Sequence, residues 1–318
     1  MAGIPDCLSF HRVLPTLAML MASLALACGT AATPAPPLAP AGVAPLPTAS
    51  GDDNALSPIL ATTILRVGTQ RLSFLLVSPK ALIKAPEATV TTRFLDDDGV
   101  GGETKRAVFH LWPYGVRGSY STDLTFDRPG RWQLDISVDD AEFSGETQLV
   151  VDVTEAAVVP DIGAVPPRSR TKTLESAGGF KVLTTDFTPD PDLYLLTIEE
   201  AVKDSKPDVI VFSTPAFCTS PTCGPQVDTV SELKDAHRGE ANFIHVEIYD
   251  NPDQIQGDLS KAKLAPAVSE WGFDKIPHWF NESWTFVLNS EGRIEQKFEG
   301  FVTLAELEET LQQVLTQK

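Results

Sequence analysis

The sequence is poor in basic residues and in cysteine. It has 25 Lys and Arg against 43 Asp and Glu, which gives a net charge of −18 at neutral pH. No basic patch interrupts this acidic character, which argues against binding to nucleic acid or to anionic lipid headgroups. Only four cysteines occur in 318 residues, so the position of each one is informative.

The apolar stretch near the N-terminus is too short to cross a bilayer. It runs for fifteen residues, from Val13 to Ala27, which is the size of the hydrophobic part of a signal peptide. Ala25 and Ala27 also fit the small-residue site at which a signal peptide is cleaved. We therefore expect residues 1–27 to be a signal peptide.

Cys28 directly follows this cleavage site. The pair Ala27-Cys28 resembles the bacterial lipobox, in which the cysteine becomes the acylated first residue of a lipoprotein. Residues 28–58 are rich in Ala and Pro, which favours an extended tether. The resemblance implies a lipid anchor that holds the protein at the cell membrane, on its extracytoplasmic face. An unlipidated secreted chain and an uncleaved anchor are the alternatives.

Residues 59–155 alternate between apolar and polar side chains with a period of two. About six such segments are separated by turn residues, and no helical pattern interrupts them, so we predict an all-β sandwich. The stretch "GSYSTDLTFDRPGRWQLDI" resembles small immunoglobulin-like domains of exported bacterial proteins. Four aromatic residues are expected in the core between the sheets: Phe109, Trp112, Phe126 and Trp132.

The periodicity changes after residue 155. Residues 156–192 are punctuated by Pro and Asp and are expected to be a connector across the surface. Residues 193–318 contain the buried strands "PDVIVFST" and "NFIHVEIY", then a hairpin, with helices before, between and after them. We expect the sandwich and this α/β region to fold independently. Two helix starts carry the capping-box spacing, at Thr197 and Glu200 and at Thr303 and Glu306.

Cys218 and Cys223 lie between the first buried strand and the following helix, in "FSTPAFCTSPTCGP". Together with "VIVFSTPAFC", "CGP" and "FVLNSEGRIEQKFEG", the order of elements resembles a thioredoxin-like domain of the membrane-tethered, extracytoplasmic kind. The resemblance implies an α/β thioredoxin-like fold after the sandwich. It also implies thiol–disulfide exchange by Cys218 and Cys223, without a cofactor, with exported protein thiols or a membrane redox partner. The family has Cys-x-x-Cys and a cis-proline before the hairpin, whereas this chain has Cys-x-x-x-x-Cys and Ser283.

The longer spacing limits where the helix can begin. Residues five apart in one continuous helix have Cα atoms about 8.7 Å apart, whereas a disulfide needs about 4.4–6.8 Å. A bridge therefore requires Cys218 to precede the helix, which would begin with Ser220 as N-cap or at Gly224. Cys218 on the exposed turn would then be the nucleophile, and Cys223 at the helix entrance would be the resolving thiol.

Two other functions are open for this pair, so whether the chain is an enzyme is also open. One is a structural disulfide in a non-catalytic thioredoxin-like binding module. The other is Cu(I) binding for copper delivery, since thiolates suit Cu(I), with Cys218, Cys223 and His278 as ligands. His245 lies within a buried strand and fits a hydrogen-bonded core histidine better than a ligand. Glu247, two residues further on, is either a proton shuttle beneath the cysteines or an ordinary strand carboxylate.

Overall fold

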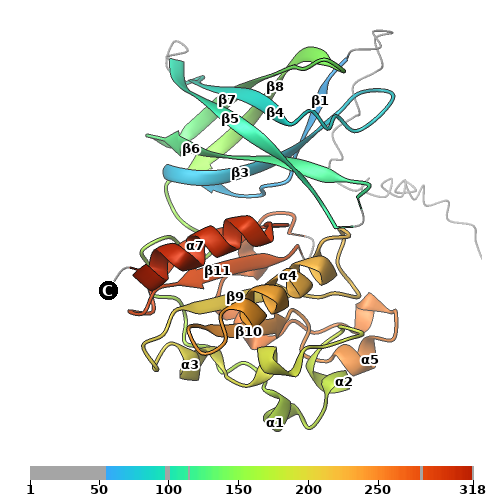
Figure 1. Ribbon diagram of the computed structural model, residues 1–318, viewed down its shortest axis with the longest axis vertical. Helices are drawn as coiled ribbons and strands as arrows, with labels where there is room; N and C mark the ends of the chain where they lie inside the picture. Colours follow the sequence, from blue (N-terminus) through green and yellow to red (C-terminus); the bar gives the residue numbers. More distant parts are fainter. Residues whose placement is uncertain (1–54, 97–100, 114, 280–281, 317–318) are drawn as a thin grey trace, which may run out of the picture. The chain divides into compact units, whose positions relative to one another are not determined.

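The computed structural model describes residues 55–96, 101–113, 115–279 and 282–316 (Figure 1). The predicted signal peptide and Cys28 lie outside these residues. Among the helices that are described, none has the length and apolar character needed to cross a membrane.

The first part of the described chain consists of β-strands. Their pairing gives the continuous order β1-β3-β6-β5-β4-β7-β8-β2. The strands are β1 (Ser57–Leu60), β2 (Leu65–Arg66), β3 (Gly68–Val77), β4 (Glu87–Phe94), β5 (Gly101–Leu111), β6 (Gly118–Phe126), β7 (Gly130–Asp139) and β8 (Ser144–Thr154).

The strand order of this β region is immunoglobulin-like. In that topology the first, second, fifth and fourth strands form one sheet, and the third, sixth and seventh form the other. If β1 and β2 are the two halves of a divided first strand, β1-β3-β6-β5 and β4-β7-β8 correspond to those sheets. β5 pairs with both β6 and β4 and so joins the two sheets, and β2 runs parallel to β8. The short strand β1 begins two residues before the predicted start of the sandwich at residue 59.

Three of the four predicted core aromatics pack in this region. Phe126 and Trp132 are buried and meet edge to face at 5.4 Å between ring centroids. Phe109 is half-buried and packs against Tyr120 at 5.2 Å. Trp112 lies one residue beyond the end of β5, where strand pairing has ended, so it is half-buried instead and its indole N–H donates to Ser119.

The predicted connector packs against the α/β region. Within residues 156–192, Leu183 is buried in the same core cluster as strands of that region, and Leu174 and Phe180 pack against this cluster. The backbone N–H of Ile294 also donates to the carbonyl of Ala164 at 2.9 Å. The segment therefore covers part of the α/β core. It contains α1 (Leu174–Ala177) and α2 (Phe180–Leu183), and the 3-10 turn η1 (Pro191–Tyr194) runs across its predicted end at residue 192.

The α/β region is built on a four-stranded sheet in the order β10-β9-β11-β12. β9 and β10 are parallel, while β11 is antiparallel to both β9 and β12. The elements are α3 (Ile198–Ala201), β9 (Asp208–Ser213), α4 (Cys223–Ala236), β10 (Asn242–Glu247), α5 (Pro252–Ile255), η2 (Leu259–Lys261), α6 (Pro266–Glu270), η3 (Phe273–Lys275), β11 (Trp284–Leu288), β12 (Ile294–Glu299) and α7 (Leu304–Thr316).

Helices cover both faces of this sheet, which explains its continuous apolar strands. Successive side chains of a strand point to opposite faces. Val209 and Val211 of β9 accordingly belong to the core under α4 and α7, which lie side by side in Figure 1. Ile210 and Phe212 belong to the opposite core, with residues of α3, α6 and η3.

Both predicted capping boxes are confirmed. The Thr197 hydroxyl accepts from the N–H of Glu200, and the Glu200 carboxylate accepts from the N–H of Thr197. Thr303 and Glu306 make the same reciprocal pair at the start of α7. The independent folding of the β and α/β regions stays a prediction.

Candidate redox-active site

The two cysteines of the α/β region form a disulfide. The Cα atoms of Cys218 and Cys223 are 6.0 Å apart, within the range of about 4.4–6.8 Å that a disulfide needs. Cys218 lies on the turn after β9 and is half-buried, whereas Cys223 is the first residue of α4 and has no exposed surface. The two sulfur atoms are therefore unequal in their access to solvent.

The helix begins between the two starts that the sequence suggested. Its N-cap is Thr222, after Ser220 and before Gly224. The Thr222 side chain makes no capping bond to the helix, because its hydroxyl donates to the carboxylate of Glu282 at 3.0 Å. A residue sixty positions further along the chain thus engages the hydroxyl of the N-cap residue.

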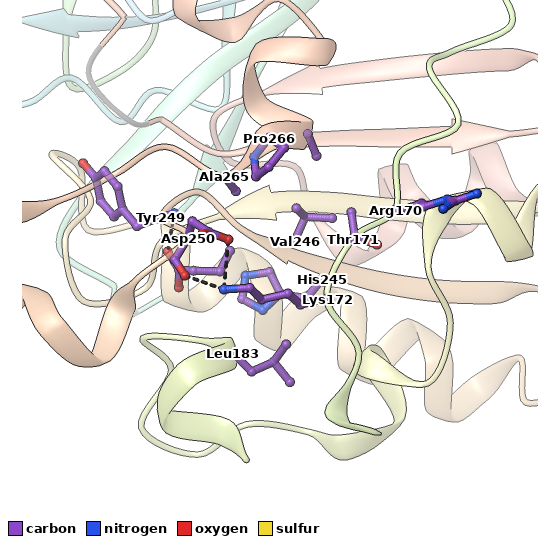
Figure 2. Close-up of a pocket in the computed structure, with 12 residues that line it drawn as sticks. Arg170, Thr171, Lys172, Leu183, His245, Val246, Tyr249, Asp250, Ala265 and Pro266 are labelled. Atoms are coloured by element: carbon purple, nitrogen blue, oxygen red, sulfur yellow. Dashed lines mark hydrogen bonds and ion pairs between the residues drawn. The ribbon is translucent and has the colours of Figure 1, made fainter. Parts of the chain in front are cut away.

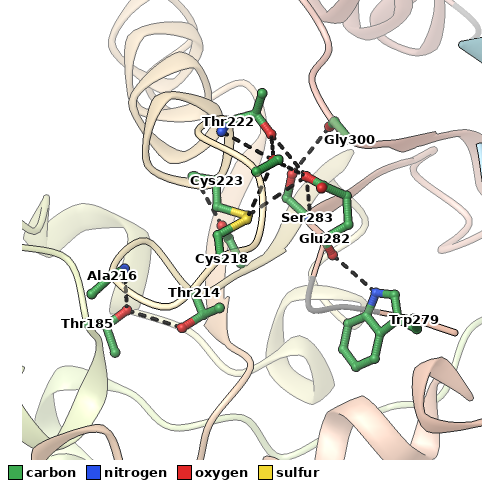
Figure 3. Close-up of a disulfide and its surroundings, with 12 residues drawn as sticks. Thr185, Thr214, Ala216, Cys218, Thr222, Cys223, Trp279, Glu282, Ser283 and Gly300 are labelled. Atoms are coloured by element: carbon green, nitrogen blue, oxygen red, sulfur yellow. Dashed lines mark hydrogen bonds between the residues drawn. A yellow bond between two sulfur atoms is a disulfide. The ribbon is translucent and has the colours of Figure 1, made fainter. Parts of the chain in front are cut away.

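Glu282 is the residue of this site that we did not predict. Its Oε1 accepts from the Ser220 hydroxyl at 2.8 Å and from the Thr222 hydroxyl at 3.0 Å (Figure 3). The same oxygen lies 4.0 Å from the Sγ of Cys223. An acidic residue just before a strand carries no recognisable motif, so only its position directly before Ser283 could have indicated it.

Aromatic packing supports the backbone at Glu282. Its carbonyl oxygen accepts from the indole N–H of Trp279 at 3.4 Å. Trp279 stacks on Phe273 at 5.5 Å between ring centroids, and Phe273 packs against Phe212 in the core at 4.9 Å. Glu282 is therefore held in place through both its backbone carbonyl and its side-chain carboxylate.

Ser283, which the sequence resemblance matched to a cis-proline, lies directly before β11. It is fully buried, and its carbonyl accepts from the N–H of Gly300 at 2.8 Å. Its own N–H lies 3.4 Å from the Oε1 of Glu282 and donates to it. Proline has no N–H, so this contact to the carboxylate needs a residue other than proline.

His278 is not brought to the sulfur atoms. It is exposed and has a left-handed backbone conformation, with φ of 58°. Among the described residues, the potential metal-ligating group consists of Cys218, Cys223 and Glu282, whose ligand atoms lie within 4.8 Å of one another. The structure thus places a carboxylate at the position where the copper alternative expected an imidazole.

His245 is a hydrogen-bonded core histidine. Its Nδ1 lies 2.6 Å from the hydroxyl of Tyr194, and its Nε2 lies 3.2 Å from the carbonyl oxygen of Ser213. Burial lowers the pKa of His245 to about 4, so the ring is neutral near pH 7. Both ring nitrogens are engaged, which explains its conformation without a metal.

Glu247 is connected to the cysteine turn through Thr185. Its Oε2 accepts from the N–H and the hydroxyl of Thr185, each at 2.8 Å. The Thr185 hydroxyl in turn accepts from the N–H of Ala216 at 3.2 Å, two residues before Cys218. Burial raises the pKa of Glu247 to about 7. A carboxyl group that titrates near neutrality thus lies two hydrogen bonds from the turn.

A cavity of about 140 Å³ is lined in part by residues of β10 and of the segment that follows it (Figure 2). His245, Glu247 and Tyr249 line it, and Lys172 forms an ion pair with Asp250 at 2.9 Å in its wall. The Tyr249 ring also meets Phe217, the neighbour of Cys218, edge to face at 6.2 Å. The cavity is therefore adjacent to the cysteine turn.

The comparisons with known proteins are sparse. No protein-family model matches the chain, and no curated protein matches it. Among solved structures, the PKD domain from human VPS10 domain-containing receptor SorCS2 is 12% identical, with 32% of this chain and 74% of that chain covered and a TM-score of 0.19.

Proposed function

We propose that the α/β region is a thioredoxin-like domain that exchanges disulfides outside the cytoplasm. The observation that carries this proposal is the unequal pair of sulfur atoms, one on a turn and one buried at the first residue of α4. A nucleophilic thiol needs access to its client, whereas a resolving thiol has only to reach its partner. The order of strands and helices and the place of the disulfide support the same interpretation.

The electrons and protons of the exchange balance between the protein dithiol and the client disulfide. The Cys218 thiolate attacks one sulfur of a client disulfide, which forms a mixed disulfide and releases the other client sulfur as a thiolate. The Cys223 thiolate then attacks the Cys218 sulfur, which forms the Cys218–Cys223 disulfide and releases the second client thiolate. The client gains two electrons and two protons, and the protein dithiol loses them. The reverse sequence oxidises a client dithiol.

The reduction potential of the Cys218–Cys223 pair tests this function. Catalytic dithiols have potentials of about −120 to −270 mV, whereas structural disulfides of secreted proteins have potentials below about −300 mV. We expect a value within the catalytic range when the full chain is equilibrated with glutathione buffers. A potential far below it would indicate a structural disulfide. Tight stoichiometric binding of Cu(I) by the reduced protein would instead favour copper delivery.

We also propose that Cys28 carries a lipid anchor that holds the protein at the membrane. The motivation is the sequence "ALAC" followed by an Ala- and Pro-rich tether. Cys28→Ser should move essentially all of the protein from the membrane fraction to the soluble fraction, because the variant lacks the thiol to which the acyl-bearing lipid is attached. Mass spectrometry of the mature N-terminus provides the check. An unmodified Cys28 there would contradict the anchor.

A further inference from the structure

The negative charge closest to the disulfide has no role in the exchange as described so far. The Glu282 carboxylate lies 4.0 Å from the Cys223 sulfur and is held there by the hydroxyls of Ser220 and Thr222. Its ligand oxygen and both sulfur atoms lie within 4.8 Å of one another. Whatever charge develops on either sulfur therefore develops next to a fixed negative charge.

We propose that Glu282 sets the direction of exchange by disfavouring the thiolate form of the reduced pair, which makes the protein a reductant of client disulfides. This inference rests on the proposed function, because it concerns the same two sulfur atoms. Like charges within about 4–6 Å disfavour one another's ionised form. The disulfide is neutral and is not affected in this way, so the carboxylate destabilises only the ionised reduced state.

The positive charge near the sulfur atoms favours a thiolate less strongly than the Glu282 carboxylate disfavours it. The N-terminus of α4 carries the equivalent of about half a positive charge, which favours a thiolate. No Lys, Arg or His occurs from Phe212 to Pro225, and His278, in the loop that leads to Glu282, is exposed. Of the titratable groups on the elements around the turn, Asp186, Asp228 on α4 and Glu247 on β10 are acidic. His245 on β10 is neutral near pH 7, and Lys234, in the last turn of α4, pairs with Asp190. A full negative charge at close range therefore outweighs the helix terminus.

The consequence for the redox equilibrium follows from the ionisation of the thiols. A reduced pair whose thiolate is stabilised holds its electrons more firmly and acts as an oxidant. Glu282 removes this stabilisation, so the reduced pair transfers its two electrons to client disulfides more readily. Because the carboxylate acts on the thiolate, its effect is small where both thiols are protonated and grows as the pH passes the thiol pKa.

Glu282→Gln tests the proposal in the full-length protein. Glutamine keeps the length of the side chain and an oxygen that accepts from Ser220 and Thr222, but it lacks the charge. The pKa of the reactive thiol, followed by thiolate absorbance, should fall by about one to three units. The equilibrium with glutathione should shift toward the dithiol only slightly at pH 6 and by about tenfold at pH 9, which corresponds to about 30 mV.

Two further variants make the result decisive. Glu282→Asp keeps the charge and should retain a pH profile close to that of the unmodified protein. Glu291→Gln removes the same charge at the other end of β11, on the exposed hairpin turn, and should change neither the thiol pKa nor the potential. An equal response to Glu291→Gln would show a general charge effect and overturn the proposal.

The experiments separate an error in the role of Glu282 from an error in the proposed exchange. If the pair is reduced and reoxidised reversibly but Glu282→Gln leaves the thiol pKa and the potential unchanged from pH 6 to pH 9, the role of Glu282 is wrong and the exchange stands. A fall in potential on removing the charge would also refute it. If the pair in the unmodified protein cannot be reduced reversibly by glutathione or dithiothreitol, the exchange itself is wrong.

Discussion

Cys223→Ser should accumulate mixed disulfides with other exported proteins, and Cys218→Ser should not. In the structure Cys218 lies on the turn that follows β9, while Cys223 is buried at the first residue of α4. An attack by Cys218 on a client leaves an intermediate that is normally released by Cys223. Serine at position 223 cannot attack the mixed disulfide, so the intermediate should persist and become visible as adducts.

The measurement is non-reducing electrophoresis of the two variants expressed in their own compartment, followed by mass spectrometry of any adducts. The adducts of Cys223→Ser should disappear on addition of dithiothreitol. The double variant, with both cysteines replaced by serine, is the matched control and should trap nothing. Equal trapping by both single variants would overturn the assignment of the two roles. A complete absence of adducts, together with an equal loss of stability in both, is the result expected of a structural disulfide.

Glu247→Gln should stabilise the protein at pH 8 by about 3 kcal/mol and leave its stability nearly unchanged at pH 4.5. Burial raises the pKa of this carboxyl from 4.5 to about 7. Between pH 4.5 and about pH 7 the unfolded state has released the proton and the folded state still holds it. The free energy of unfolding therefore falls as the pH rises, by about 1.4 kcal/mol per pH unit. Above pH 7 both states have released the proton, and the free energy of unfolding falls no further from this cause. Glutamine carries no proton to release, so the variant avoids this loss.

The two strong hydrogen bonds of Glu247 are compatible with the substitution. Its Oε2 accepts both bonds from Thr185, and a glutamine carbonyl in the same place accepts them equally well. The glutamine NH2 cannot accept the long bond that the Tyr249 N–H donates to Oε1 at 3.4 Å, and this loss is the same at every pH. Urea unfolding of variant and unmodified protein at pH 4.5, 6 and 8 gives the difference at each pH, in which the contributions of other buried groups cancel. Glu291→Gln, on an exposed turn, should show no such trend. A difference that does not change with pH would mean that Glu247 is already ionised in the folded protein.

Much of the architecture could be predicted because it depends on local patterns. Alternation with a period of two placed the strands of the β region, and continuous apolar segments placed β9 and β10, because a strand covered by helices on both faces has no polar side. The capping boxes at Thr197 and Thr303 marked two helix starts, since the side chains that make them are three residues apart in the chain. The requirement that Cys218 precede the helix followed from helix geometry and the length of a disulfide.

The features that the sequence did not reveal depend on contacts between distant segments. Trp112 was expected in the core, but strand pairing ends at Leu111, and no local pattern marks that end. The predicted connector covers the core because Leu183 meets strands that follow it in the chain. α4 begins at Cys223, and the hydroxyl of its N-cap residue Thr222 donates to Glu282, about sixty residues later, instead of capping the helix. The residue types and their spacing thus determined a pair of thiols at a helix start, whereas the tertiary structure decided which charge stands beside them, since a charge acts through distance in space and not along the chain.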